Sequence, residues 1–156
     1  MSLARTLLLT GLFIGLHSAH ANPVEEVSTV LDHFHRAAAE ARFDDYFGLF
    51  APDAVFIGTD ASERWTVAEF QAYAKPHFDR GRGWTYTKTA RQVNVSADGQ
   101  HASFDELLDN ASLGVCRGTG VLRRVAGNWK IEQYHLTIPV PNALADEVVK
   151  RIRSAP

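Results

Sequence analysis

Alternating apolar and polar positions are clearest near the end of the chain, where two strand-like runs flank a short turn. The runs cover residues 117–125 and 129–140 and are rich in β-branched and aromatic side chains, with Gly127-Asn128 between them. A Gly-Asn pair between two such runs is typical of a β-hairpin. The pattern therefore predicts an antiparallel hairpin, and we expect the upstream elements to fold onto it.

Three upstream segments instead repeat their apolar residues at helical spacing. The first begins at about Pro23, with Asn22 as its cap, and has one apolar face. That face carries Val27, Val30, Leu31, Phe34 and Ala38. His33 and His35 fall off this stripe, so we expect both imidazoles in solvent. A second, shorter helix is expected over about residues 43–50.

The third helix should start at about Val67, because Thr66 and Glu69 form a capping box at that point. Pro76 should kink or end it, since proline has no backbone N–H to donate. Its inner face would carry Phe70, Tyr73, Ala74 and His77. This helix follows a short strand expected over residues 55–58 and a polar loop.

The remaining pattern predicts strands over residues 84–95 and 101–110, joined by an Asp98-Gly99 turn. A last helix is expected after Asn142 as its cap. Its inward face would carry Leu144, Val148 and Ile152. Helices and one strand followed by a run of antiparallel strands predict an α+β fold. A curved sheet of this kind would wrap around an interior cleft.

The N-terminal residues have the pattern of a signal peptide. Arg5 precedes an apolar run over residues 6–16, and Ala19-His20-Ala21 is an A-x-A cleavage site. We therefore expect residues 1–21 to be removed and residues 22–156 to form a single domain, periplasmic or secreted. The apolar run is short for a transmembrane helix, so no stable membrane anchor is expected after cleavage. A retained anchor or a buried helix is the alternative.

Composition narrows the possible functions. The 156-residue chain has a net charge of −2, which offers no basic surface for nucleic acid. Its one cysteine, Cys116, lies in an apolar strand and is expected to be a buried, inert thiol. The seven histidines are scattered, and no glycine-rich phosphate loop or nucleophile elbow occurs. We therefore expect neither a metal nor a cofactor.

Several local strings resemble the SnoaL-like branch of the nuclear transport factor 2-like (NTF2-like) superfamily. The matching stretches are residues 55–65, 83–86, 103–106, 117–120 and 129–142. The resemblance implies a cone, in which a strongly curved antiparallel sheet is closed by helices around a pocket. It also implies a homodimer formed through the sheet. The superfamily hosts isomerases, cyclases, dehydratases, hydrolases and plain binding modules, so it leaves the activity open.

Glu106 is the most informative single residue. It lies between Phe104 and Leu108 on the expected inner face of its strand, where a carboxylate must be desolvated or paired. Arg117 on the next strand is the expected partner. Glu106 is therefore either a general base or ligand-orienting group, or one half of a structural ion pair.

Asp60 and His135 are the other candidates for acid–base chemistry. Asp60 belongs to a polar loop that either rims a site or is locked by an Asx-turn. The resemblance implies that an acid near the mouth of the cone can shuttle protons. His135 continues the series from Trp129 and Ile131, so strict alternation would direct it into the cone and Tyr134 outward, unless a bulge intervenes. A hydrogen-bonded core histidine is the alternative.

Aromatic residues are numerous for a small domain, and those near the cleft would favour an apolar or aromatic ligand. The expected pocket residues are Phe56, Thr59, Trp65, Tyr73, Trp84, Arg117 and Tyr134. Two functions follow from these observations. One is an enzyme that transfers protons without a cofactor, as in isomerisation, cyclisation or dehydration. The other is a non-catalytic module that binds a small molecule or a protein partner.

Overall fold

The computed structural model describes residues 22–155. The signal peptide expected over residues 1–21 lies outside this part of the chain. The elements in order are α1 (Pro23–Ala39), α2 (Phe43–Phe47), β1 (Phe50–Ile57), β2 (Arg64–Thr66), α3 (Val67–Phe78), β3 (Thr87–Val95), β4 (His101–Asn110), β5 (Gly114–Val125), β6 (Asn128–Thr137), η1 (Asn142–Leu144) and α4 (Ala145–Ser154). This arrangement confirms the α+β fold class.

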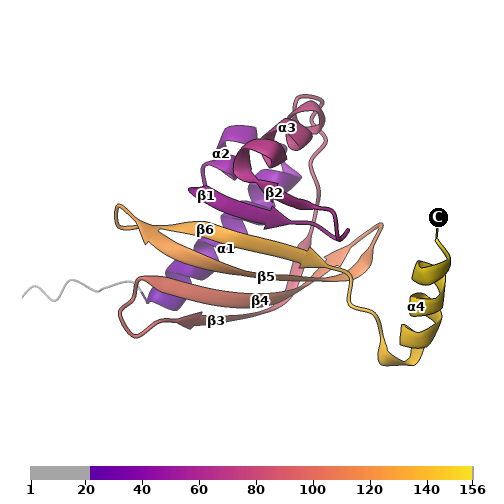
Figure 1. Ribbon diagram of the computed structural model, residues 1–156. Helices are drawn as coiled ribbons and strands as arrows, with labels where there is room; N and C mark the ends of the chain where they lie inside the picture. Colours follow the sequence, from indigo (N-terminus) through magenta and orange to yellow (C-terminus); the bar gives the residue numbers. More distant parts are fainter. Residues whose placement is uncertain (1–21, 156) are drawn as a thin grey trace, which may run out of the picture.

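One sheet organises the molecule, with strand order β2-β1-β6-β5-β4-β3. All neighbouring strands are antiparallel except β1 and β6, which pair in parallel. Helix α1 crosses one face of the sheet and contacts β3 and β6, while α3 contacts β1 and β2 (Figure 1). The helices and the inner face of the sheet therefore enclose the interior.

Local signals account for the ends of the first helices. The Asn22 side chain accepts a hydrogen bond from the Val24 N–H, and Pro23 occupies the first turn, as predicted. The capping box of Thr66 and Glu69 is also confirmed. Pro76 lies in the last turn of α3, which continues two residues further to Phe78. The helix therefore ends soon after the proline, as expected.

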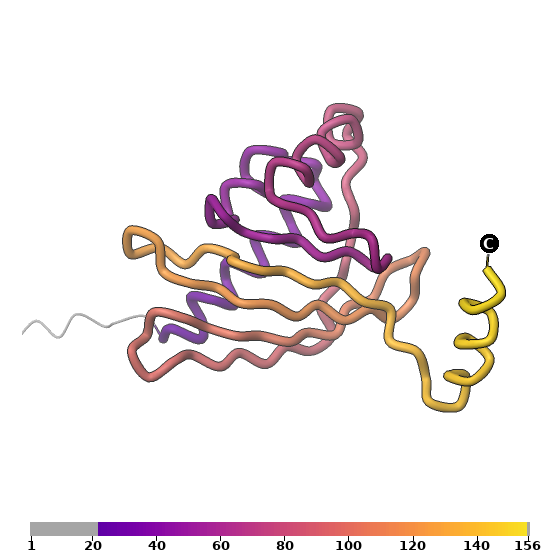
Figure 2. Tube along the Cα trace, in the orientation of Figure 1, coloured from indigo at the N-terminus to yellow at the C-terminus, as the bar shows by residue number. Residues whose placement is uncertain are grey.

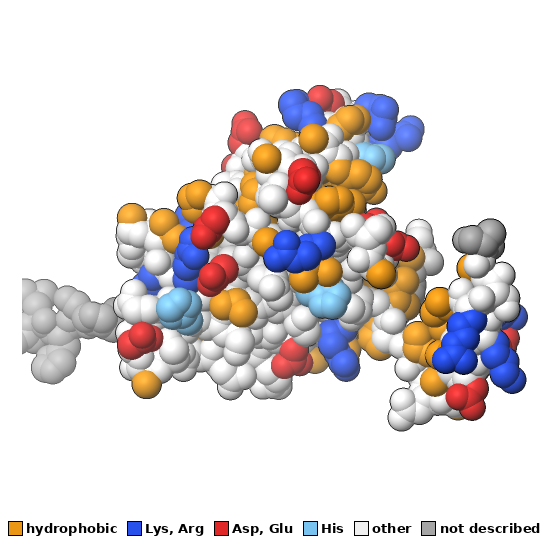
Figure 3. All heavy atoms as spheres, in the orientation of Figure 1, with side chains coloured by type: hydrophobic (Ala, Val, Ile, Leu, Met, Phe, Trp, Pro, Cys, Tyr) orange, Lys and Arg blue, Asp and Glu red, His pale blue; other side chains and the backbone are white. Residues whose placement is uncertain are grey.

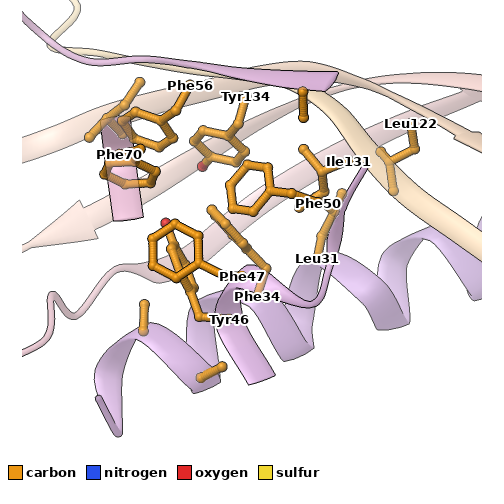
Figure 4. Packing of buried hydrophobic residues seen from close by; sticks show 14 of the residues in the cluster. Leu31, Phe34, Tyr46, Phe47, Phe50, Phe56, Phe70, Leu122, Ile131 and Tyr134 are labelled. Atoms are coloured by element: carbon orange, nitrogen blue, oxygen red, sulfur yellow. The ribbon is translucent and has the colours of Figure 1, made fainter. Parts of the chain in front are cut away.

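The core between helices and sheet is largely aromatic. Figure 4 shows rings from α1, α2, β1, α3 and β6 converging on one interior region. Phe34 stacks on Tyr46 with ring centroids 4.6 Å apart, and Phe56 stacks on Phe70 at 4.0 Å. Offset stacking of this kind adds to the area that the rings bury. The aromatic residues thus hold together elements that are distant in sequence.

The C-terminal helix does not pack as predicted. Helix α4 projects from the body after an extended segment, and none of its residues is buried (Figures 1 and 2). Leu144 and Ile152 are 49% and 68% exposed, so the prediction that they face inward is wrong. Pro141, not Asn142, precedes the 3-10 turn η1, and no side chain caps either helix. Two prolines, Pro139 and Pro141, favour an extended backbone and direct the helix away.

The outer face of the sheet differs from its inner face. Figure 3 views this outer side, where charged and histidine side chains are scattered over the strands among apolar ones. The core residues of β4 and β5 point away from this side, as their alternating burial requires. Within residues 22–155, no helix is long and apolar enough to cross a membrane.

Candidate functional site

A cavity of about 180 Å³ lies between the helices and the inner face of the sheet. It is lined by Phe34, His35, Ala38, Tyr46, Phe56, Gly58, Thr59, Glu63, Trp65, Phe70, Tyr73, Trp84, Tyr86, Leu113, Tyr134 and Leu136. Ten of these sixteen residues are aromatic, if His35 is counted, so the wall is apolar with a few polar groups. A largely apolar wall with few convergent polar groups is typical of a small-molecule site.

Much of the wall consists of nearly parallel rings. The planes of Phe56 and Tyr134 differ by 4°, those of Trp65 and Phe70 by 10°, and those of Phe70 and Trp84 by 23°. The residues come from β1, β2, α3, the segment before β3, and β6. Parallel rings present flat faces, so the wall is suited to a flat apolar molecule.

The polar centre of the site is the Glu106 carboxylate, whose side chain is fully buried. Its Oε1 atom accepts hydrogen bonds from His35 Nε2 at 2.7 Å and from the Tyr134 hydroxyl at 2.9 Å. Its Oε2 atom accepts a hydrogen bond from Arg91 Nε at 2.8 Å and lies 2.7 Å from Arg91 Nη2. A buried carboxylate needs such partners, and both oxygens of Glu106 have them.

Register in the sheet brings these groups together. Arg91 on β3 lies directly opposite Glu106 on β4, and Glu106 lies opposite Gly118 on β5. Because Gly118 has no side chain, the Tyr134 ring from β6 can extend over it to reach the carboxylate. Arg91 also donates to Ser28 O and Asp32, so it ties α1 to the sheet.

We expect Gly118→Ala to disrupt this contact. A Cβ atom at this position would overlap the Tyr134 hydroxyl and lie 3.0 Å from Glu106 Oε1, so the tyrosine must move away from the carboxylate. Overpacking of this kind costs about 1–3 kcal/mol of unfolding free energy, measurable by urea denaturation. Thr119→Ala, at the neighbouring half-buried position of β5, is the matched control. Equal stabilities of the two variants would contradict the tight contact.

Electrostatics keep Glu106 ionised. Burial by itself would raise the pKa of its carboxyl group, but the hydrogen bond from His35 and the Arg91 guanidinium outweigh burial and hold the pKa below its ordinary value. Burial, together with the same carboxylate, raises the pKa of Tyr134 well above its ordinary value. Tyr134 therefore remains a neutral phenol that donates to Glu106.

His35 connects the buried carboxylate to the cavity. Its Nε2 atom must carry the proton, because the ionised Glu106 can only accept. In the neutral imidazole this leaves the lone pair on Nδ1, which has no protein hydrogen-bond partner among residues 22–155. The ring lines the cavity, so the arrangement provides a base that is oriented and electrostatically supported by a carboxylate.

The hypothesis that Arg117 pairs with Glu106 is wrong. Arg117 lies opposite Leu107, so its exposed side chain belongs to the outer face of the sheet. The guanidinium that reaches Glu106 comes from Arg91, on the other neighbouring strand. Arg91 alternates with Val93 and Val95 on β3, and this period of two is the signal that could have identified it.

A bulge reverses the expected directions of Tyr134 and His135. Gln133 pairs with Val121 and Ile131 with Leu122, so Glu132 is an extra residue in β6. Beyond it, Tyr134 is buried in the interior, whereas half-buried His135 occupies the outer face. The expectation that His135 points into the cone is therefore wrong, because strict alternation does not hold across the bulge.

Asp60 lies in an exposed loop and does not line the cavity. It accepts a hydrogen bond from the Ser62 N–H at 2.8 Å, which is the Asx-turn considered above. Hydrogen bonds from Ser62 lower the pKa of the Asp60 carboxyl group. Its polar neighbour Glu63 lines the cavity instead.

The expected pocket residues are placed as follows. Those on the cavity wall are Phe56, Thr59, Trp65, Tyr73, Trp84 and Tyr134, whereas Arg117 is not among them. Their contact with a ligand remains a prediction. Within residues 22–155, no group of three or more histidine, cysteine or acidic side chains could hold a metal ion.

The expectation that His35 lies in solvent is also wrong, since it is 9% exposed. His35 lies four residues after Leu31 and three before Ala38, both of which are buried. This helical spacing places it on the edge of the apolar stripe, where it could have been recognised. Tyr46 of α2 also lines the cavity, although it was not among the expected pocket residues.

Comparisons with known proteins agree with this architecture. A model of the SnoaL-like domain family matches residues 27–141. No curated protein matches the chain significantly. An NTF2-like protein of unknown function from Pseudomonas putida superposes with a TM-score of 0.64 and 14% identity, covering 76% of this chain and 87% of that protein.

Two further structures carry a suggested activity. A candidate dehydratase of the NTF2-like family from Streptomyces avermitilis has a TM-score of 0.65 and 17% identity, covering 76% of this chain and 96% of its own. A candidate scytalone dehydratase from Novosphingobium aromaticivorans has a TM-score of 0.61 and 9% identity, covering 74% of this chain and 83% of its own. At these identities the similarity establishes the fold, in agreement with the expected cone.

Proposed function

The chain belongs to the SnoaL-like domain family, and on this basis we propose that it binds a small, largely apolar molecule and catalyses proton transfer on it. The observation that carries the proposal is His35, which lines the cavity and is hydrogen-bonded to the buried, ionised Glu106 at 2.7 Å. A histidine oriented by a carboxylate is a common general base and acid.

In the proposed reaction, His35 Nδ1 removes a proton from a carbon next to a carbonyl group of the ligand. The C–H electron pair moves into the C–C bond, and the carbonyl oxygen becomes an enolate oxygen. Glu106 stabilises the imidazolium that forms, because its negative charge lies against Nε2. Return of the proton to another carbon completes an isomerisation, and protonation and departure of a β-hydroxyl group as water completes a dehydration.

The test uses 2-tetralone, a flat ketone with acidic protons at C1, incubated with the protein in D₂O. We expect NMR to record faster loss of the C1 proton signal than in buffer or with heat-denatured protein. Exchange that is no faster than in buffer, despite binding of the ketone, would contradict base catalysis. That outcome would favour the rival function, a non-catalytic ligand-binding or protein-interaction module.

We also propose that the protein acts outside the cytoplasm as a homodimer. The pattern of residues 1–21 supports export, and the resemblance to the NTF2-like superfamily supports the dimer. Native mass spectrometry of protein from the exported fraction reports both properties, together with any co-purifying small molecule. An unprocessed or monomeric mass would contradict the corresponding part of the proposal.

A further inference from the structure

An apolar surface begins inside the cavity and continues, uncovered, toward the C-terminus. On the inner face of β6, Tyr134 and Leu136 are buried and line the cavity. The chain continues with an apolar residue at every second position, but Ile138 and Val140 are exposed. Leu144, the last residue of η1, is exposed as well. The apolar wall of the cavity therefore extends past its rim onto a surface that residues 22–155 leave in solvent.

Helix α4 continues this surface. Val148 and Ile152 follow Leu144 at intervals of four residues, so the three side chains share one helical face. Figure 3 shows apolar side chains gathered on the side of α4 that is turned toward the body of the molecule. An isolated helix of ten residues is marginal in water, since most helical stability comes from packing of the apolar face. The face of α4 therefore requires a partner surface.

The segment before α4 holds the helix away from its own body. Pro139 and Pro141 fix their own φ angles and disfavour the helical conformation in the residue before each of them. Residues 138–141 are accordingly extended, and such a segment spans about 3.1 Å per residue. Figures 1 and 2 show α4 standing apart at the end of this segment. A projecting element of this kind can be exchanged with a second copy, which is a low-cost route to a dimer.

The mouth of the cavity offers a surface of matching chemistry. The β1–β2 loop, the β4–β5 turn and the end of β6 lie at the same end of the sheet, because β1 is parallel to β6 and β5 is antiparallel to it. Leu113 in the β4–β5 turn and Tyr73 on α3 both line the cavity, yet they are 41% and 50% exposed. Exposed apolar side chains thus border the mouth, where an apolar helix face could cover them.

The charges at the mouth and on α4 are opposite in sign. Glu63 lines the cavity, and Asp60 is its neighbour in the β1–β2 loop, with its N–H donating to the Glu63 carboxylate at 3.2 Å. Neither carboxylate has a cationic partner among residues 22–155. On α4, Lys150 and Arg153 have no acidic partner in the same part of the chain. Complementary charge therefore favours this helix at this mouth.

We propose that α4 packs over the cavity mouth of a second copy, while the α4 of that copy covers the mouth of the first. Val148 and Ile152 of one copy would lie against Leu113 and Tyr73 of the other, so each cavity would be closed by residues from both chains. The cations of α4 would face the two carboxylates of the loop. Residues 138–155, with the mouth residues that they cover, approach the roughly 20–30 residues a side of a stable interface.

Cross-linking tests this contact directly, because the one cysteine of the chain, Cys116, is buried. Leu113→Cys and Ile152→Cys chains, each with a different affinity tag, are co-expressed and treated with a short bismaleimide. We expect a covalent pair that carries both tags. Ala97→Cys, in the exposed β3–β4 turn at the far end of the sheet, replaces Leu113→Cys as the control and should give no pair. No mixed pair, or an equal yield with the control, would overturn the inference.

Two other occupants of the apolar face are distinguished by the same substitutions. If α4 folded back onto its own mouth, a chain that carries both Leu113→Cys and Ile152→Cys would give only an intramolecular cross-link. A basic amphipathic helix can also bind a bilayer surface. Cosedimentation with phosphatidylglycerol vesicles that Ile152→Asp abolishes, without cross-linking between chains, would assign the face to a membrane. Either of these results would overturn the exchange between copies.

Closure of the mouth supplies a second readout, the quenching by acrylamide of Trp65 and Trp84, which line the cavity. Ile152→Asp places a charge on the apolar face and should weaken the association about 10-fold or more. Quenching should therefore be weaker in the wild type than in Ile152→Asp. Ser154→Asp, on the other side of α4, is the matched control and should behave as the wild type.

This second readout also isolates the contact from the other proposals. Equal quenching in the wild type and Ile152→Asp would overturn the inference. A dimer formed only through the outer faces of two sheets would give that result and no cross-link, since α4 would then remain uncovered. Neither readout uses 2-tetralone or proton transfer, so the inference and the proposed function can fail separately.

Discussion

A His35→Gln variant is expected to lose the catalysed exchange of 2-tetralone protons by a factor of about 10²–10⁴, the usual contribution of a general base. Glutamine is a suitable replacement because its side-chain amide can still donate to Glu106 from near the place of Nε2. The variant thus removes the lone pair of Nδ1 while preserving a partner for the buried carboxylate. The NMR rate of C1 deuteration measures the effect.

His135→Gln is the matched control for this experiment. His135 is the same residue type, but it occupies the outer face of the sheet, beyond the bulge at Glu132. We expect it to exchange the ketone at the wild-type rate. Equal rates in all three proteins would rule out His35 as the base, and a loss confined to His135→Gln would assign the base to the outer face.

Glu106→Gln is expected to lower the unfolding free energy by about 3 kcal/mol, with a fall of roughly 10 °C in melting temperature. The substitution leaves the Arg91 guanidinium, whose side chain is only 5% exposed, without its buried anion. Asp32 remains 2.7 Å from Arg91, which is why we expect the lower end of the range for broken buried pairs. Urea denaturation monitored by circular dichroism measures the difference.

Two comparisons make this prediction specific. Glu132→Gln removes a carboxylate from the more exposed pair with Arg123, and it should cost less than about 1 kcal/mol. Adding Arg91→Met to Glu106→Gln should cost less than the sum of the two single changes, because the unpaired cation is then gone. Simple additivity of the two changes would contradict a direct coupling between the groups.

The pH dependence of stability has a defined sign. The folded-state pKa of Glu106 lies below the ordinary value of 4.5, so its ionised form stabilises the fold above pH 4.5. This contribution disappears as the pH falls through the lowered pKa. The difference in unfolding free energy between wild type and Glu106→Gln should therefore shrink below pH 4.5, and a difference independent of pH would contradict the ion pair.

Much of the fold could be predicted from sequence because its signals are local. The cap at Asn22, the box of Thr66 and Glu69, and the turn at Gly127 each depend on neighbouring residues only. Inward positions on β4 follow from alternation, so Glu106 could be identified as a buried carboxylate on the inner face. The cone shape could be expected because several short sequence stretches resemble the NTF2-like superfamily.

The partners of Glu106 could not be predicted in the same way. His35 is 71 residues away in the chain, and its helical spacing places it at the edge of the apolar stripe of α1 without showing that it meets Glu106. Choosing between Arg91 and Arg117 requires knowing which guanidinium is on the inner face of its strand. Likewise, α4 has an amphipathic sequence, but only the folded chain shows that none of its residues is buried among residues 22–155.

The sequence by itself thus determined the order of elements, their capping and the inner faces of regular segments, because these depend on interactions within a few residues. Tertiary structure decided which side chains meet. One extra residue at Glu132 directs Tyr134 inward and His135 outward, and the bare backbone at Gly118 leaves room for the tyrosine. Such choices depend on the pairing of distant strands, since a shift of one residue moves every following side chain to the opposite face.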